Sequence, residues 1–109
     1  MKIYLSLPII TTEIDRCKKR AERMKKQLAN KGHEVITPFD ISAGKKKTYS
    51  YFVGKDIEAL MLCDAIFLMS GWSESKTCNL EWRCAQIYNK EIFQHLNNIP
   101  NGRTKTRNA

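Results

Sequence analysis

The sequence predicts a single α/β domain, Rossmann-like or flavodoxin-like, with a mainly parallel sheet of four to five strands between helices. Two observations carry this prediction. Short, β-prone apolar runs alternate with helical segments over residues 1–96, and a chain of 109 residues provides one core rather than two. Strands that alternate with helices at this spacing form right-handed βαβ units, so the strands are expected to run parallel.

The first half of the domain is expected to hold two strands and the helix that joins them. Residues 2–7 (KIYLSL) are apolar and β-prone, which predicts a strand buried on both faces and ended by Pro8. A helix follows, because apolar residues recur at spacings of three and four: Ile14, Cys17, Ala21, Met24 and Leu28. Gly32 is expected to end that helix, and residues 33–37 (HEVIT) form the second strand.

The second half repeats the pattern and ends in a basic tail. The predicted elements are a polar loop over 39–49, a helix over 50–63, a strand over 64–69, a turn over 70–78, a helix over 79–89 and a strand over 91–96. Residues 97–109 show no periodicity. They are expected to be disordered or bound to a partner, outside a domain of residues 1–96.

Charge and hydropathy limit the classes of partner that this protein is expected to have. The net charge is +8, and many basic residues lie on the outer face of the first helix and in the tail. A solvated helix face explains them better than a nucleic-acid surface, because no aromatic-rich basic motif of the RNA-binding type is present. No apolar run approaches the ~18 residues of a membrane span. Tyr4, Ser6 and Pro8 interrupt the apolar N-terminus, which lacks a cleavage-like site, so we expect a cytoplasmic protein with no membrane partner.

Neither a metal centre nor a disulfide framework is expected. Cysteines occur at positions 17, 63, 78 and 84 without a C-x-x-C pair, and His33 and His95 stand alone. Cys17 and Cys63 fall on apolar helix faces, which is typical of core residues. No cofactor is expected either.

The position of a binding site follows from the predicted topology. Ligands of open parallel sheets bind beyond the carboxyl ends of the strands, near the point where strand order reverses. The segment Leu7, Pro8 and Ile9 and the turn over 70–78 both lie at that edge. Glu81 follows this turn inside the next helix. By position alone, Glu81 is either a first-turn acid that favours the helix dipole or part of a site.

Three segments together resemble the nucleoside 2-deoxyribosyltransferase-like superfamily: KIYLSLPI, YFVGKDIEALMLCDAIFLMSGW and SESKTCNLE. The resemblance covers about residues 1–96 with the elements in the same order. It is closest to the small members, namely deoxynucleoside 5'-monophosphate N-glycosidases and an uncharacterised bacterial and phage domain family. It implies an enzyme acting on a small nucleotide or nucleoside and assembled as a homo-oligomer, for which Trp82 and Tyr88 are candidate contact residues.

The resemblance also implies roles for particular residues. Glu81 matches the glutamate that attacks the anomeric carbon of the sugar. Asp56 matches an aspartate that opens the preceding helix and holds or protonates the departing base, and Tyr4 matches the tyrosine that orients the nucleophile. Ser75 stands where the monophosphate hydrolases carry a serine that contacts phosphate. This serine favours a nucleotide over a free nucleoside as substrate.

These residue types suit the cleavage of an N-glycosidic bond. A carboxylate stabilises the oxocarbenium-like state or forms a glycosyl intermediate, and it must be ionised to do so, which a tyrosine hydroxyl favours. An aspartate gives a proton to the base if burial or a nearby carboxylate raises its pKa. The phosphate would be held by Ser73, Ser75 and backbone N–H groups, within the turn that includes Gly71. Phe39 and Asp40 are expected to frame the base.

Two departures from the family pattern leave alternatives open. Leu7 replaces the glycine of the G-P-I motif, and Thr77 replaces the glycine of the S-x-G motif. Glycines at such places let the backbone approach a ligand, so leucine and threonine are expected to narrow the pocket, move the phosphate or abolish turnover. The alternatives are base exchange between nucleosides and a non-catalytic nucleotide-binding domain. Nucleic-acid binding is the weakest of them.

Overall fold

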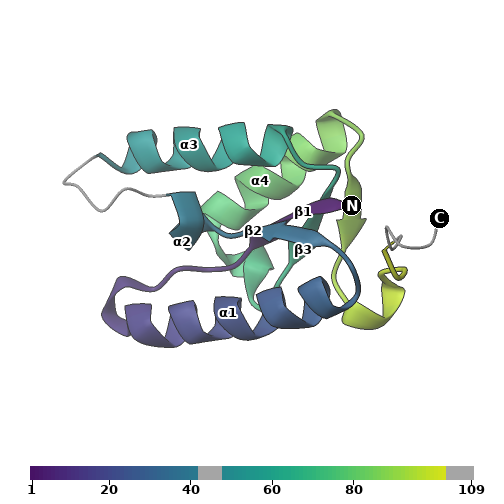
Figure 1. Ribbon diagram of the computed structural model, residues 1–109. Helices are drawn as coiled ribbons and strands as arrows, with labels where there is room; N and C mark the ends of the chain where they lie inside the picture. The colour runs from purple at the N-terminus through teal and green to yellow at the C-terminus, as the bar shows by residue number, and fades with distance from the viewer. Residues whose placement is uncertain (42–47, 103–109) are drawn as a thin grey trace.

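The structure is a computed structural model that describes residues 1–41 and 48–102. Its sheet has four strands in the order β2-β1-β3-β4, and all three strand pairs are parallel. One helix, α1, covers one face, while α3 and α4 cover the other (Figure 1). The predicted α/β class and parallel sheet are confirmed. The strands are β1 (Lys2–Ser6), β2 (Glu34–Ile36), β3 (Ala65–Leu68) and β4 (Glu91–Phe93), and the main helices are α1 (Ile14–Asn30), α3 (Tyr49–Met61) and α4 (Lys76–Ile87).

Strand β1 lies inside the sheet and sends alternate side chains to two separate cores. Ile3 and Leu5 join the apolar cluster on the α1 side, which includes Cys17. Tyr4 joins the cluster on the side of α3 and α4. Because side chains of a strand alternate with a period of two, Ser6 faces the same side as Tyr4. The strand therefore presents two hydroxyl groups to the layer that contains α4.

The strand order reverses between β1 and β3. The chain leaves β1 through α1 toward β2, and it leaves β3 through α4 toward β4 on the opposite face. The N–H of Met69 donates to the carbonyl of Ser6 over 2.9 Å, so the two strands end side by side. Gly71 has a φ of +90°, and a Cβ there would meet Pro8 at 3.5 Å. The loops after β1 and β3 are therefore neighbours at the carboxyl edge.

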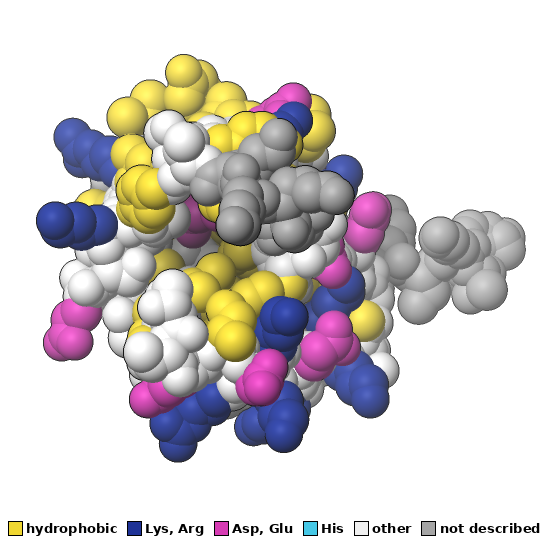
Figure 2. Space-filling model, turned by 90° about the vertical axis from the view of Figure 1, so that its left-hand side faces the viewer, with side chains coloured by type: hydrophobic (Ala, Val, Ile, Leu, Met, Phe, Trp, Pro, Cys, Tyr) yellow, Lys and Arg dark blue, Asp and Glu magenta, His cyan; other side chains and the backbone are white. Residues whose placement is uncertain are grey.

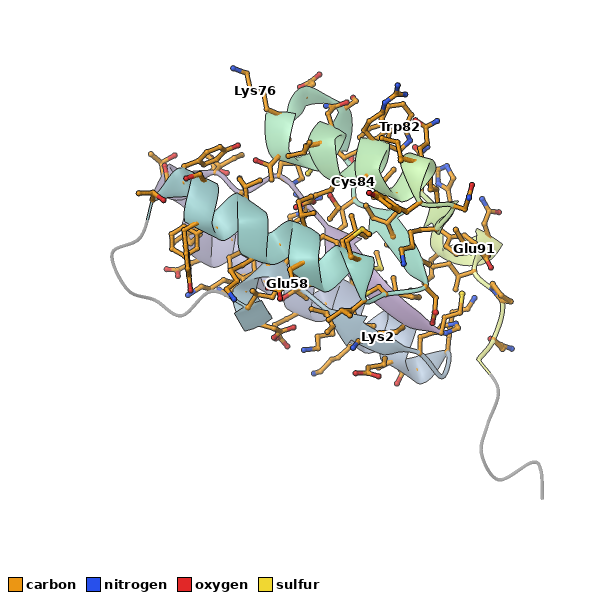
Figure 3. All side chains as sticks on the ribbon, turned by 90° about the horizontal axis from the view of Figure 1, so that it is seen from above. Lys2, Glu58, Lys76, Trp82, Cys84 and Glu91 are labelled. Atoms are coloured by element: carbon orange, nitrogen blue, oxygen red, sulfur yellow. The ribbon has the colours of Figure 1, made fainter. Side chains whose placement is uncertain are left out.

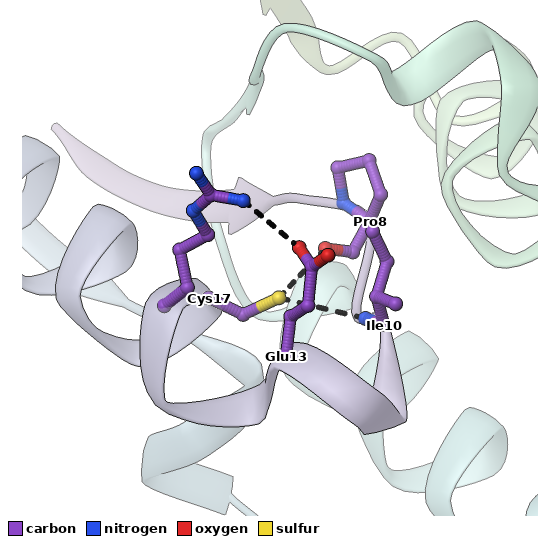
Figure 4. Close-up of polar contacts among 5 residues, drawn as sticks. Pro8, Ile10, Glu13 and Cys17 are labelled. Atoms are coloured by element: carbon purple, nitrogen blue, oxygen red, sulfur yellow. Dashed lines mark hydrogen bonds and ion pairs between the residues drawn. The ribbon is translucent and has the colours of Figure 1, made fainter.

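A sulfur atom anchors the loop that follows β1. The Sγ of Cys17 accepts from the N–H of Ile10 over 3.5 Å and donates to the carbonyl of Pro8 over 3.6 Å (Figure 4). Glu13 and Arg16 form an exposed ion pair nearby, with 3.2 Å between Oε1 and an Nη atom. Cys17 is buried, as its place on the apolar stripe predicted. It fixes the Pro8–Ile10 backbone against α1.

Helix boundaries differ from the predicted ones where capping residues were overlooked. Helix α4 begins at Lys76 rather than 79, because the Ser75 hydroxyl accepts from the N–H of Cys78 over 3.1 Å and caps the helix. Helix α3 begins at Tyr49 after the cap Thr48. Asp56 therefore lies in the middle of α3, and the prediction that it opens a helix was wrong. Strand β4 ends at Phe93, three residues early.

Short helices occupy three segments that were not predicted to be helical. They are α2 (Pro38–Ile41), which starts the expected 39–49 loop, and the 3₁₀ turns η2 (Trp72–Glu74) and η3 (Leu96–Asn98); a further turn, η1 (Thr11–Glu13), leads into α1. Residues 42–47 of the expected loop lie outside the described residues. Within the described parts of the chain, no helix is long and apolar enough to cross a membrane.

Residues 97–102 contact the domain instead of forming a free tail. Ile99 is only 2% exposed and joins the α1-side core. The His33 ring donates from Nε2 to the carbonyl of Pro100 over 2.7 Å, and the N–H of Gly102 donates to the carbonyl of Lys31. A Cβ on Gly102 would collide with the Gly32 carbonyl, so glycine permits this approach. The prediction of disorder from polar composition is therefore wrong for residues 97–102, because burial of Ile99 holds this segment on the domain. Residues 103–109 lie outside the described residues.

Replacing Ile99 with alanine is expected to destabilise the protein by about 2–5 kcal/mol, because it leaves a cavity in the core. Urea unfolding measures the loss. Ile87→Ala is the matched control, since Ile87 is 60% exposed, and it should change the free energy of unfolding by less than about 0.5 kcal/mol. Equal stabilities of the two variants would contradict the docking of this segment.

The outer side of α4 carries apolar groups. Trp82 packs against Trp72 with 5.6 Å between ring centroids, and the Trp72 indole donates to the Gln94 side chain over 3.4 Å. Figure 3 shows Trp82 and Cys84 on this helix, viewed from the side away from the sheet. Ile87 and Tyr88 are exposed at its end.

Candidate active site

A cavity of about 420 Å³ opens at the carboxyl edge of the sheet. Figure 2 views the molecule from this edge and shows a hollow with hydrophobic side chains around it and an acidic group in its depth. Most of the lining is apolar, with a few hydroxyl groups, two carboxyl groups and one ammonium group. The lining residues are Leu7, Ile9, Thr11, Ile14, Lys18, Pro38, Phe39, Tyr49, Phe52, Val53, Asp56, Ser75, Thr77 and Glu81.

The Glu81 carboxyl group is held from the sheet on both of its oxygens. Tyr4 donates its hydroxyl to Oε2 over 2.9 Å, and Ser6 donates to Oε1 over 2.7 Å. Glu81 itself is 2% exposed. Burial raises the pKa of Glu81 to about 7, against the opposing effect of the Ser6 and Tyr4 hydrogen bonds and with a smaller rise from Asp56. Glu81 is thus an oriented carboxyl group rather than a surface acid of the first helical turn.

The Tyr4 hydroxyl keeps its proton at neutral pH and so remains a hydrogen-bond donor there. Burial, followed by the charges of Glu81 and Asp56, raises its pKa well above the ordinary value. A protonated phenol next to a carboxylate stabilises the ionised form of the carboxylate. This is the orienting position that the family resemblance implied for Tyr4.

The second carboxyl group of the cavity belongs to Asp56. It projects from α3, is 9% exposed, and shares the cavity with Glu81. Burial raises the pKa of Asp56 to about 6. Its charge also raises the pKa of Glu81, so both carboxyl groups titrate near neutral pH, and Asp56, which has the lower pKa, loses its proton first. A Glu81 nucleophile and an Asp56 acid need the reverse arrangement, with Glu81 ionised and Asp56 protonated, so a proton must pass from Glu81 to Asp56 before or as the substrate binds.

Hydroxyl groups gather where α3 and α4 begin. Ser75 and Thr77 both line the cavity. The Thr77 hydroxyl lies 2.6 Å from the hydroxyl of Tyr49, so the residue that replaces a family glycine bridges the two helices. The Ser75 oxygen caps α4, and its side chain also hydrogen-bonds with the Cys78 thiol. Phosphate oxygens need donors such as hydroxyl groups.

Other residues expected at the site fall into two groups. Leu7, Ile9 and Phe39 line the cavity. Four others do not: Pro8 and Gly71 pack against each other, Ser73 is exposed, and Asp40 binds Lys25 and the N–H of Thr37. For Ser73 the predicted contribution is not supported, because the 3₁₀ turn η2 turns it outward while its carbonyl accepts from the Asn79 amide over 2.9 Å.

Sequence reasoning missed four polar residues of the site, among them Thr11, which was expected only to cap the first helix. Ser6 was detectable, because it lies two residues after Tyr4 on the same face of a strand. Lys18 was detectable too, since it lies one helical turn after Ile14. Tyr49 was not, because it was assigned to a loop rather than to the start of α3. In the parts of the chain that are described, no group of three or more His, Cys, Asp or Glu side chains is placed to hold a metal ion.

Solved structures that share this fold include an N-glycosidase and a 2-deoxyribosyltransferase. One similar solved structure is the CMP N-glycosidase BcmB of Clostridium botulinum, with a TM-score of 0.61, 20% identity, and coverage of 93% of this chain and 84% of that one. Another is the 2-deoxyribosyltransferase of Bacillus psychrosaccharolyticus, with a TM-score of 0.60, 16% identity, and coverage of 97% and 95%. Within this fold, the chain belongs to the family described as a domain of unknown function, DUF4406, whose model matches residues 1–94. No curated protein matches the sequence.

Proposed function

We propose that this protein hydrolyses the N-glycosidic bond of a (deoxy)nucleoside 5'-monophosphate, releasing the free base and the sugar phosphate. The observation that carries the proposal is the Glu81 carboxyl group, which is buried, held by two hydroxyl donors and turned toward a cavity that also contains Asp56. A buried acid with no cation paired to it costs stability, and such sites are commonly functional.

The proposed reaction has two steps. In the first, a Glu81 oxygen bonds to C1' of the sugar as the bond from C1' to the base nitrogen breaks, and the base takes the Asp56 proton. In the second, water attacks C1' and gives a proton to the Asp56 carboxylate, and the ester to Glu81 breaks. The products are base and sugar phosphate, and both carboxyl groups return to their starting states.

A phosphorylated substrate suits the polar part of the lining. Lys18 is the one positively charged side chain among the described residues that line the cavity, and Thr11, Ser75 and Thr77 add hydroxyl groups. The apolar part, with Phe39 and Phe52, suits the faces of a base. A volume of about 420 Å³ falls in the usual range for small-molecule sites. The name of the similar structure from Clostridium botulinum, a CMP N-glycosidase, agrees with a nucleoside monophosphate as substrate.

Incubation with a panel of ribonucleoside and deoxyribonucleoside 5'-monophosphates is expected to release free base, measured by chromatography. The unphosphorylated nucleosides are the matched controls and should react at least about tenfold more slowly, since each charged hydrogen bond to phosphate contributes roughly 1.5 kcal/mol or more. Adding a second base separates the alternatives: a new nucleotide or nucleoside would indicate base exchange. Tight binding of a monophosphate without base release over hours would contradict hydrolysis and favour a non-catalytic binding domain.

A further inference from the structure

A second hydroxyl group, besides that of Tyr4, contacts the proposed nucleophile, Glu81. We propose that Ser6 is a positioning residue that acts jointly with Tyr4 to hold the Glu81 carboxylate ionised and directed at the substrate. The inference rests on the proposed function for its catalytic consequence. Its physical part, the effect of the Ser6 hydroxyl on Glu81, is testable without any substrate.

The contact is short and comes from the buried end of an interior strand. The distance from Ser6 Oγ to Glu81 Oε1 is 2.7 Å, and Ser6 has no exposed surface. Strand β1 lies between two parallel strands, pairing with β2 through Lys2, Ile3 and Tyr4 and with β3 as far as Ser6, which lies opposite Leu68. A donor on an interior strand of a sheet has little freedom to move. It therefore fixes the acceptor oxygen as well as stabilising its charge.

Tyr4 alone does not account for the orientation of Glu81. Its hydroxyl reaches Oε2, while Ser6 reaches Oε1, so each carboxylate oxygen has one donor from the sheet. Each oxygen keeps a further lone pair for the cavity. With a single donor the carboxyl group would still be free to turn about the bond to its side chain. Two donors, placed two residues apart on the same face of β1, remove that freedom.

The charged and titratable groups around Glu81 leave the stabilisation of its anion mainly to these hydroxyls. Asp56, on α3, raises the pKa of Glu81 by its charge. Cys78, on α4 itself, stays a neutral thiol because burial raises its pKa. Lys18, on α1, lines the same cavity but forms no ion pair with Glu81 in the described structure. Tyr4 and Ser6, on β1, are the groups that favour ionisation.

A purely structural role for Ser6 makes a different prediction. If Ser6 only provides a hydrogen bond that stabilises the fold, removing its hydroxyl should lower the free energy of unfolding. The pKa of Glu81 and the acid limb of the pH-activity profile should then stay unchanged. If Ser6 positions and ionises the nucleophile, Ser6→Ala should raise the pKa of Glu81. The nucleophile must lose its proton to act, so the loss of activity should be larger in acid than in alkaline solution.

The test compares Ser6→Ala with Tyr4→Phe, which removes the donor to the other oxygen. Carbon-13 NMR of the glutamate side-chain carboxyl groups, with Glu81→Gln identifying the Glu81 signal, should show a higher titration midpoint in both variants. With a substrate from the nucleotide panel, kcat should fall about 10- to 100-fold at pH 6 and less at pH 8.5, as expected for a hydrogen bond to a charged group, with KM nearly unchanged.

The controls separate the possible failures. Ser70→Ala removes an exposed serine hydroxyl just after β3 and should change neither the titration nor kcat. If Ser6→Ala does not fold, Ser6→Cys keeps the side-chain shape with a weaker donor and is measured in the same way. An unchanged Glu81 midpoint in a folded Ser6 variant overturns the inference. A shifted midpoint in a protein that releases no base leaves the hydroxyl effect standing and removes the proposed function instead.

Discussion

Replacing Glu81 with glutamine is expected to abolish base release, lowering kcat on the order of 10⁴-fold or more, as loss of a covalent nucleophile does in other enzymes. The amide has nearly the shape of the carboxyl group and keeps an oxygen that accepts from Tyr4, but it neither attacks C1' nor stabilises positive charge there. The measurement is release of free base from the best nucleoside monophosphate of the panel, followed over hours so that slow residual turnover is detected.

The stability of the Glu81→Gln variant should rise with pH relative to that of the unmodified protein. Burial raises the pKa of Glu81 from about 4.5 to about 7, so the folded protein prefers the protonated acid. The contribution of this group is favourable below about pH 4.5 and is lost as the pH rises toward 7. The full loss is on the order of 3 kcal/mol. Glutamine, which does not ionise, escapes it, so its Tm should exceed that of the unmodified protein by more at pH 8 than at pH 5.5.

An exposed acid supplies the matched control for Glu81. Glu74→Gln makes the same change in η2, outside the cavity lining, and should leave base release and the pH dependence of stability unaltered. Together the two variants separate loss of the nucleophile from any general effect of removing a negative charge. Base release near the unmodified rate in Glu81→Gln would refute the assignment of the nucleophile and, with it, the proposed mechanism.

Much of the fold is predictable because it follows from local patterns. The period of two in β1 and the spacings of three and four in α1 belong to residues near one another in the chain, and they survive in the structure. Features that depend on a single contact between residues far apart in the sequence could not be predicted in this way. Ile99 reaches the α1-side core, and three residues later Gly102, which lacks a Cβ, passes close to Gly32. No local window contains both glycines.

The site was predictable in its carboxyl groups and less so in its hydroxyl groups. The family resemblance selected Glu81, Asp56 and Tyr4, and the fold brings two of them within hydrogen-bonding distance, with Asp56 on the same cavity. Ser73 and Ser75 are indistinguishable by composition and spacing. Their difference depends on where α4 begins, because the capping residue lies over the cavity and the serine two residues earlier turns outward with η2. Capping geometry therefore decided which serine reaches the site.

Changing Asp56 to asparagine is expected to lower kcat about 10²- to 10⁴-fold on nucleoside monophosphates, the usual contribution of a general acid. A general acid must hold its proton, so in the unmodified protein the rate should fall on the alkaline side of the pH profile as the carboxyl pair loses its last proton. That limb should disappear in Asp56→Asn. The acid limb should move to lower pH, because the charge of Asp56 no longer raises the pKa of Glu81.

The leaving group decides whether Asp56 acts as an acid or only shapes the cavity. In a substrate that carries a 4-nitrophenoxy group in place of the base, the leaving group departs as 4-nitrophenolate and needs no proton. The Asp56→Asn variant should therefore cleave this substrate nearly as fast as the unmodified protein does. Asp64→Asn is the matched control, since Asp64 lies at the opposite edge of the sheet and its Oδ2 accepts from the N–H of Lys2 over 2.8 Å. It should behave like the unmodified protein toward both substrates. If Asp56→Asn lowers kcat equally on both substrates, Asp56 acts in binding rather than as an acid. Loss of a proton donor would slow only the substrate whose leaving group needs a proton.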